Sequence, residues 1–228
     1  MRPISGIAAT LVAVATALVL LVVAVTPFLT PAWVSFEQER ADAAAWTGYS
    51  RDDLRTATEA ILTDLVVGPP AFDVSIGGKP VLIEAERSHM RDVRRVFSGF
   101  YLAGVVAFAI LLAGRFAAGR VKGWSPREFW GAIRIGGLGL LLGVVVAGIG
   151  SVVAFDAAFE AFHKIFFSAG TYLFDPQTDR LVQLFPERFW SETAIAVGVL
   201  AAGLSVVALA GAARRRTRTD RDLEAGVQ

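Results

Sequence analysis

The sequence predicts an all-α membrane protein with four transmembrane helices, both termini in the cytoplasm, and a small extracytoplasmic α/β cap formed by the first loop. Hydrophobic residues make up 54% of the 228 residues and charged residues only 19%, which is too apolar for an ordinary soluble domain. The apolar residues also fall into four blocks, each close to the roughly 20 residues that a helix needs to cross about 30 Å of hydrocarbon.

The four blocks predict spans at about residues 4–29, 97–118, 132–155 and 193–213. The first block is much longer than the roughly 7–15-residue apolar core of a signal peptide, so we interpret it as an uncleaved anchor. Residues 1–213 are then a single membrane domain, with extracytoplasmic segments at about 30–96 and 156–192. The remainder, 214–228, is expected to be a disordered, basic cytoplasmic tail.

The distribution of charge predicts the orientation of the chain. The termini and the short middle loop together carry eleven Lys and Arg residues against four acids, whereas the two longer segments on the opposite side carry eleven against seventeen acids. Short basic segments remain in the cytoplasm. The arginine-rich tail is therefore interpreted as a topology signal and a contact for anionic membrane lipid, and nothing in the sequence favours a nucleic-acid partner.

The first extracytoplasmic segment contains signals for three short elements. Ser50 and Asp53 have the spacing of a capping box, and Leu54, Ile61 and Leu65 follow on one face of a helix. A Gly77-Gly78 pair between two β-prone runs predicts a small hairpin. The stretch EAERSHMRDVRRVF is expected to be a helix that runs directly into the second span.

The chain has only two histidines, and both lie near the ends of spans. His89 precedes the second span by eight residues, and His163 follows the third by eight. If both helices continue past the bilayer, each histidine lies roughly 12 Å above its span, at about 1.5 Å per residue. The two spans are antiparallel neighbours because a short loop joins them. We therefore expect the two imidazoles to meet on the extracytoplasmic side.

Carboxylates accompany each histidine on its helix face. Glu160 precedes His163 by three residues, and Asp92 follows His89 by three, so Asp92 and Glu160 are candidates for orienting the rings. The other interpretation is that the histidines are ordinary interfacial residues and that the carboxylates belong to solvated helix faces. The shared side and height favour a functional pair.

Several classes of chemistry lack their residues. The chain has no cysteine, and it contains no G-x-S-x-G, H-E-x-x-H or Walker motif. The histidines and acids do not have a diagnostic metal-ligand spacing, so no metal and no cofactor is predicted. What remains is general acid–base chemistry by imidazole on an amphiphilic substrate at the membrane surface.

Two motifs carry a resemblance to a known family. The stretch ERSHMRDVRRVF (residues 86–97) and the stretch FHKIFFSAGTYLFDPQTDRLVQLFPERFW (residues 162–190) resemble the two characteristic blocks of the lipoprotein intramolecular transacylase family, called Lit. The four-span layout with a large first exported loop is also similar. The resemblance covers nearly the whole chain, apart from the arginine-rich tail.

The resemblance implies a bacterial cytoplasmic membrane enzyme with its active face outside. Such an enzyme moves the sn-2 acyl chain of a diacylglyceryl-cysteine lipoprotein to the α-amine of that cysteine, giving a lyso-form lipoprotein. The catalytic histidines of the family correspond to His89 and His163. Arg91 and Arg94, together with Arg95, either contact the phosphate of lipid headgroups or simply end the helix. The alternative function is a non-enzymatic membrane partner or scaffold with the same fold.

Overall fold

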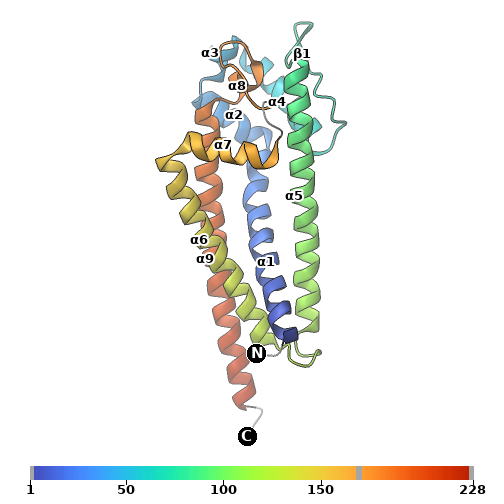
Figure 1. The fold of residues 1–228 in the computed structure, drawn as a ribbon, viewed down its shortest axis with the longest axis vertical. Coiled ribbons are helices and arrows are strands. Elements are labelled where there is room, and N and C mark those ends of the chain that lie inside the picture. Colours follow the sequence, from blue (N-terminus) through green and yellow to red (C-terminus); the bar gives the residue numbers. More distant parts are fainter. Residues whose placement is uncertain (1–2, 168–170, 226–228) are drawn as a thin grey trace. The chain divides into compact units, whose positions relative to one another are not determined.

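A computed structural model of the chain describes residues 3–167 and 171–225. Its order of elements is shown in Figure 1. The elements are α1 (Pro3–Val25), η1 (Thr26–Leu29), α2 (Pro31–Arg40), α3 (Ala43–Thr47), α4 (Arg51–Val66), β1 (Ser75–Ile76), β2 (Lys79–Pro80), α5 (Glu84–Ala117), α6 (Pro126–Val153), α7 (Phe155–Phe166), α8 (Arg180–Leu184) and α9 (Glu187–Ala225).

Within the part of the chain that the structure describes, four helices are long and apolar enough to cross a membrane, as the sequence predicts. The candidate spans are Gly6–Leu29, Glu84–Ala117, Pro126–Gly150 and Glu187–Arg218. The helix of the second span, α5, has 34 residues and is therefore about 51 Å long. This length exceeds the roughly 30 Å of hydrocarbon. The expectation that the segment containing His89 runs into the second span as one helix is confirmed.

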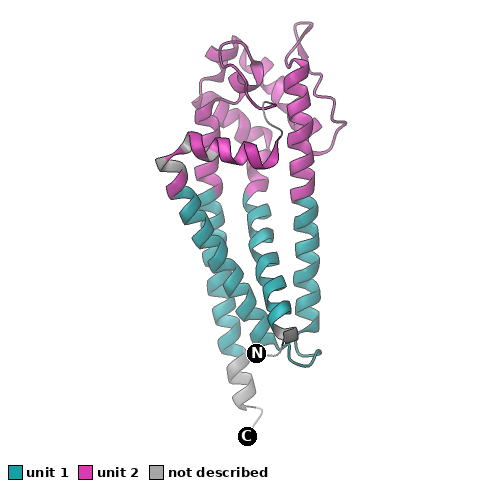
Figure 2. Ribbon diagram, in the orientation of Figure 1, with its two compact units in different colours: residues 1–24, 101–148, 198–228 teal, residues 25–100, 149–197 magenta. Residues whose placement is uncertain are grey.

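The predicted single membrane domain divides by its contacts into two compact units (Figure 2). Unit 1 contains residues 1–24, 101–148 and 198–228, and unit 2 contains residues 25–100 and 149–197. Unit 1 is therefore built from the apolar parts of the long helices. Unit 2 consists of the two polar segments together with the adjoining helix ends.

Close helix contacts in unit 1 depend on glycine. A Cβ atom on Gly136 of α6 would lie 2.2 Å from the carbonyl oxygen of Ala13 in α1, and one on Gly104 of α5 would lie 2.8 Å from a methyl group of Val22. Only a residue without a side chain allows these backbones to approach so closely. Apolar side chains away from these contacts are exposed, with Leu102 at 65% and Val105 at 67%, as suits helices surrounded by lipid.

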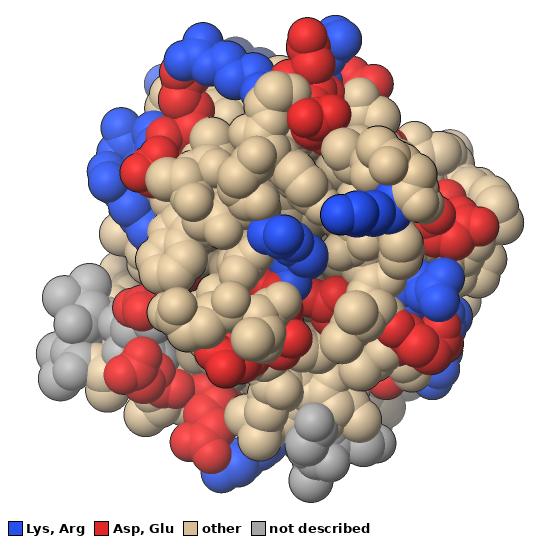
Figure 3. All heavy atoms as spheres, turned by 90° about the horizontal axis from the view of Figure 1, so that it is seen from above, with Lys and Arg blue, Asp and Glu red and all other residues tan. Residues whose placement is uncertain are grey.

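Unit 2 has its own hydrophobic core. Ile61 of α4, Phe72, Leu82, Met90 of α5 and Leu184 of α8 are all nearly inaccessible to solvent. The core thus joins the first polar segment, the start of α5 and the second polar segment. The surface seen from above carries acidic and basic side chains interspersed with one another (Figure 3).

The short elements of unit 2 follow the predicted local signals. Ser50 and Asp53 form the capping box at the start of α4, and the predicted apolar face of that helix is buried. Strands β1 and β2 pair antiparallel across Gly77 and Gly78, whose φ angles are +58° and +76°. A tight two-residue hairpin turn favours positive φ at both central positions, and glycine adopts it without strain.

The helix ends differ from the simplest expectation in two places. α6 does not continue as a straight helix through residue 163, because the backbone breaks at Ala154, with φ −151° and ψ 61°, and α7 begins at Phe155. α7 is strongly amphipathic, and a change of direction at its start lets its exposed apolar face turn toward lipid. The tail from Arg214 onward is helical as far as Ala225, because it contains good helix formers and reaches no glycine or proline before Gly226.

Candidate active site: a buried histidine pair

His89 lies near the start of α5 and is held there by a buried carboxylate. Glu86, one turn earlier, is completely inaccessible to solvent. Its two oxygens accept hydrogen bonds from the backbone N–H groups of Ile83, at 2.7 Å, and of Leu181 in α8, at 2.6 Å. Glu86 therefore fixes the beginning of α5 against the second polar segment, one helical turn from the imidazole.

The ring of His89 is buried, with 7% of the residue exposed. Within the described residues its Nδ1 atom has no hydrogen-bond partner. A buried ring nitrogen without a partner is costly for stability. Such groups concentrate at functional sites, where a ligand or substrate supplies the missing bond.

His163 lies in the last turn of α7 and is 9% exposed. Its Nδ1 atom is 2.8 Å from the backbone carbonyl oxygen of Phe159. A carbonyl oxygen only accepts hydrogen bonds, so Nδ1 must carry the proton. In the neutral ring, the lone pair is therefore on Nε2.

The two imidazoles face one another. Their ring centroids are 6.1 Å apart, and the ring planes are inclined by only 20°. The predicted meeting of the two histidines is confirmed, although α7 brings His163 there as a separate helix rather than as the extension of α6.

Aromatic rings surround the histidine pair. Phe167 contacts both imidazoles, with centroid distances of 4.8 Å to His89 and 5.4 Å to His163. Phe174 packs against His89 at 5.5 Å, and Tyr172 packs against His163 at 4.9 Å. These three rings, together with Phe159 and Phe162 of α7, form the aromatic shell of the site.

Burial determines the charge state of His163. Removal from water lowers the pKa of His163 below its usual value, and the hydrogen bond to the Phe159 carbonyl only partly opposes this effect. The imidazole is thus neutral at physiological pH and able to accept a proton at Nε2. Two positive charges on facing rings would repel each other strongly in this environment, which further favours a neutral pair.

The two carboxylates expected to orient the rings have other partners. The Asp92 carboxylate pairs with Arg95 at 2.7 Å, and Glu160 pairs with Lys164 at 2.7 Å. Basic residues one turn away compete successfully for these partly exposed acids. The group that orients His163 is instead the Phe159 carbonyl, and no pattern of side chains could have indicated a backbone acceptor.

Glu86 is the site residue whose role the sequence analysis missed. Glu86 precedes His89 by three residues and so shares its helix face, but no motif assigns it a function. The available signal was an acid at the first turn of a helix, where it can accept a backbone hydrogen bond. Its second bond, to Leu181, joins positions 95 residues apart and required the tertiary structure.

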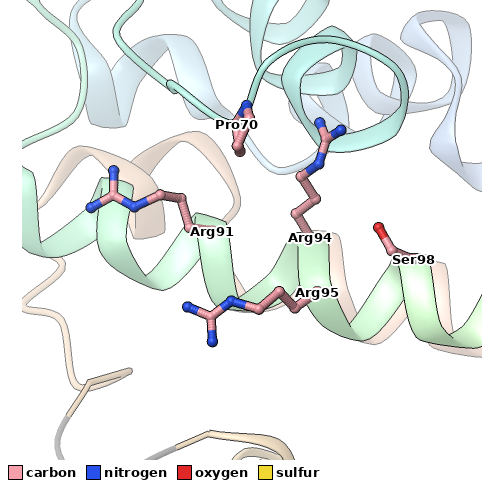
Figure 4. Close-up of a pocket in the computed structure, with 5 residues that line it drawn as sticks. All are labelled: Pro70, Arg91, Arg94, Arg95 and Ser98. Carbon is pink, nitrogen blue, oxygen red and sulfur yellow. The ribbon is translucent and has the colours of Figure 1, made fainter.

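Arg91 and Arg94 project from α5 (Figure 4), two and five residues after His89 on that helix. Arg91 pairs with Glu84 at 2.5 Å, and Arg94 donates to the backbone carbonyl of Asp64 near the end of α4. Both line a cavity with Pro70, Arg95 and Ser98. Among the described residues, no group of three or more His, Cys, Asp or Glu side chains could hold a metal ion.

The fold and this site define a multi-span helical membrane protein with a buried pair of imidazoles. Comparisons with known proteins extend this result. A family model described as "Lipoprotein intramolecular transacylase Lit" matches residues 8–190, so the chain belongs to the Lit family of acyltransferases. The match covers both histidines and all the candidate site residues.

Solved structures share the fold. The chain is similar to the membrane integral lipoprotein intramolecular transacylase Lit from Bacillus cereus, with a TM-score of 0.77 at 18% identity, over 97% of this chain and 99% of that one. Two structures of the same protein with one histidine replaced, by alanine or by arginine, give TM-scores of 0.73 and 0.71 at 18% and 17% identity. Each match covers 96% of this chain, with 96% and 95% of the respective solved chains.

A relative by sequence is an uncharacterised protein of Aquifex aeolicus (strain VF5). It is 30% identical over 123 residues, which are 54% of this chain and 52% of that protein. The match therefore spans about half the length of that relative. Together with the four apolar helices, membership of the Lit family identifies a multi-pass bacterial membrane protein.

Proposed function

We propose that this chain transfers the sn-2 acyl group of a diacylglyceryl-cysteine lipoprotein to the α-amine of the same cysteine, giving a lyso-form lipoprotein. The observation that carries the proposal is the histidine pair, two buried imidazoles with centroids 6.1 Å apart in a chain of the Lit family. That spacing lets both rings reach one small reacting centre.

The reaction requires movement of protons but no enzyme nucleophile. The cysteine nitrogen forms a bond to the ester carbonyl carbon, and the bond from that carbon to the glyceryl oxygen breaks. The amine loses a proton and the glyceryl oxygen gains one, so an ester and an amine become an amide and an alcohol. A base near the nitrogen and an acid near the leaving oxygen accelerate both steps.

The hydrogen bonding of the two rings favours particular roles. His163 acts as the base, because its Nδ1–H is held by the Phe159 carbonyl, which leaves the lone pair on Nε2 to accept the proton of the amine. His89 then serves the oxyanion or the leaving oxygen, since its buried Nδ1 has no partner within the described residues and can bond to the substrate.

The aromatic shell suits a lipid substrate. Phe162 is 49% exposed and Phe166 is 47% exposed on the apolar face of α7, so this helix can hold acyl chains beside the histidine pair. Because both reacting groups belong to one bound molecule, the site gains most by positioning them. The charge asymmetry of the chain supports an active face on the extracytoplasmic side, with both termini in the cytoplasm.

The proposal is tested in a bacterial host that makes diacylglyceryl lipoproteins but lacks N-acylation. The chain is produced there with a reporter lipoprotein, and mass spectrometry of the reporter's N-terminal peptide locates the acyl chains. We expect an N-acylated lyso-form with the wild-type chain, and none with His89→Gln or His163→Gln. The exposed Lys164→Gln, adjacent to His163, is the control and should retain the product.

Two results would contradict the proposal. Unmodified diacylglyceryl reporter in the presence of correctly inserted wild-type protein would exclude the transacylase and favour the non-enzymatic membrane partner. Full product with either histidine variant would remove that residue from the mechanism.

A further inference from the structure

A recess on α5 lies beside the point where the helix becomes apolar. Arg95 is the last charged residue before an uncharged stretch that extends to Arg115 on the same helix. This stretch of about 19 residues is roughly 28 Å long, close to the thickness of the hydrocarbon. Arg95 therefore lies at the depth of lipid headgroups.

The recess has a volume of about 320 Å³ and is lined by Pro70, Arg91, Arg94, Arg95 and Ser98. Figure 4 shows side chains from one stretch of α5 and the loop after α4 around it. Arg91, Arg95 and Ser98 are four and three residues apart, and so lie on one face of the helix. Their guanidinium and hydroxyl groups are hydrogen-bond donors that line the same recess.

The carboxylates near the recess do not neutralise it fully. Glu84 is shared between Arg91, at 2.5 Å, and Arg87, at 2.8 Å. Asp92 pairs with Arg95, whose side chain is 79% exposed. Exposed ion pairs of this kind are weak, so both arginines can turn to a stronger anionic ligand.

Arg94 has a different role in the same recess. It donates to the backbone carbonyl of Asp64 and so joins α5 to the end of α4, while the Asp64 carboxylate accepts from the Phe72 N–H at 2.7 Å. Arg94 therefore fixes the wall of the recess and contributes a positive charge.

We propose that this recess binds the phosphate group of a phospholipid in the surrounding leaflet, through Arg91, Arg95 and Ser98. Guanidinium groups match phosphate oxygens with paired hydrogen bonds, and the depth of Arg95 matches that of a lipid phosphate. The glyceryl group of the proposed substrate is attached to cysteine and has no phosphate, so this lipid is a second ligand. The inference does not depend on the proposed function.

The experiment compares a lipid whose headgroup carries a phosphate with a lipid that has no phosphate, and with inorganic phosphate alone. Native mass spectrometry of the full chain in neutral detergent measures binding of phosphatidylglycerol, of diacylglycerol with the same acyl chains, and of inorganic phosphate. We expect phosphatidylglycerol to bind at least tenfold more tightly than diacylglycerol, and inorganic phosphate at equal concentration not to displace it.

Arg91→Gln/Arg95→Gln should weaken phosphatidylglycerol binding at least tenfold and leave diacylglycerol binding unchanged. Its matched control is Arg51→Gln/Arg55→Gln on α4, which also removes two exposed arginines four residues apart, each paired with an acid. Arg91→Lys/Arg95→Lys keeps the charge and should give an intermediate affinity. If the double glutamine variant fails to fold, Arg95→Gln alone should show a smaller loss in the same direction.

Three outcomes would overturn the inference. The first is equal binding of phosphatidylglycerol to the wild type and to the folded glutamine variant. The second is diacylglycerol binding as tightly as phosphatidylglycerol, which would show that the phosphate is not recognised. The third is displacement by equimolar inorganic phosphate, which would assign the recess to a free anion instead of a lipid.

Discussion

The backbone carbonyl group of Phe159, on the same helix, sets the tautomer of His163. His89, opposite, has a buried Nδ1 without a partner among the described residues. The two rings are therefore unequal although their sequence positions are symmetrical. This inequality is what lets us propose separate roles for a base and for a group that serves the oxyanion or the leaving oxygen.

Burial of neutral His163 should make the protein sensitive to acid. Because the pKa of His163 is lowered in the folded state, the unfolded chain binds the proton more tightly. The buried neutral ring contributes fully to stability above the pKa of histidine in the unfolded chain, about 6.5. This contribution is lost as the pH falls toward the folded-state pKa. We expect the unfolding temperature in detergent to fall on acidification from about pH 7 to about pH 5, and to fall less in His163→Gln. Equal falls in the two proteins would contradict this assignment.

Removal of Glu86 should disturb the site strongly, although the bonds of Glu86 are to the backbone and not to the imidazoles. Glu86→Ala leaves two backbone N–H groups without their charged acceptor, which should lower the free energy of unfolding by about 2–4 kcal/mol. Denaturant titration in mixed micelles would measure the loss. The control is Glu84→Ala, which removes an exposed acid from the same helix turn and should have little effect. Similar losses in both variants would contradict a specific role for the buried carboxylate.

At the scale of elements, local signals predicted what local interactions determine. The capping box at Ser50, the buried face of α4 and the Gly77-Gly78 turn all occur as expected. Residue counting also predicted the meeting of His89 and His163. The break at Ala154 was missed, because no proline marks it and because it depends on what surrounds the apolar face of α7. That is a property of the surroundings, which the spacing of residues does not contain.

Packing of α1 against α6 should depend on one glycine. Gly136→Ala places a methyl group 2.2 Å from the Ala13 carbonyl oxygen, and such overpacking typically costs about 1–3 kcal/mol. Gly139→Ala on the same helix meets nothing within 4 Å and is the matched control. Thermal unfolding in detergent should show a clear loss for the first variant and none for the second. Equal stability of the two variants would show that α1 and α6 do not pack this closely.

At the scale of the whole molecule, the charge asymmetry predicts the orientation in the membrane. The chain has no cysteine, so single cysteines report topology without background. In intact cells, a membrane-impermeant maleimide should label Thr56→Cys in the first polar segment and should leave Thr217→Cys unlabelled until the cells are opened. The reverse pattern would place the histidine pair on the cytoplasmic side and contradict the proposed access to exported lipoproteins.

The central claim is that two imidazoles move an acyl chain within one lipoprotein, and a purified reaction tests it most directly. A synthetic diacylglyceryl lipopeptide is incubated with the detergent-solubilised chain, and fragmentation mass spectrometry locates the acyl groups. Intramolecular transfer leaves the total mass unchanged and moves one acyl chain from the glyceryl group to the cysteine nitrogen. We predict this isomer with the wild-type chain and its absence with His89→Gln and with His163→Gln. No conversion by folded wild-type protein, or equal conversion by both variants, would contradict the account.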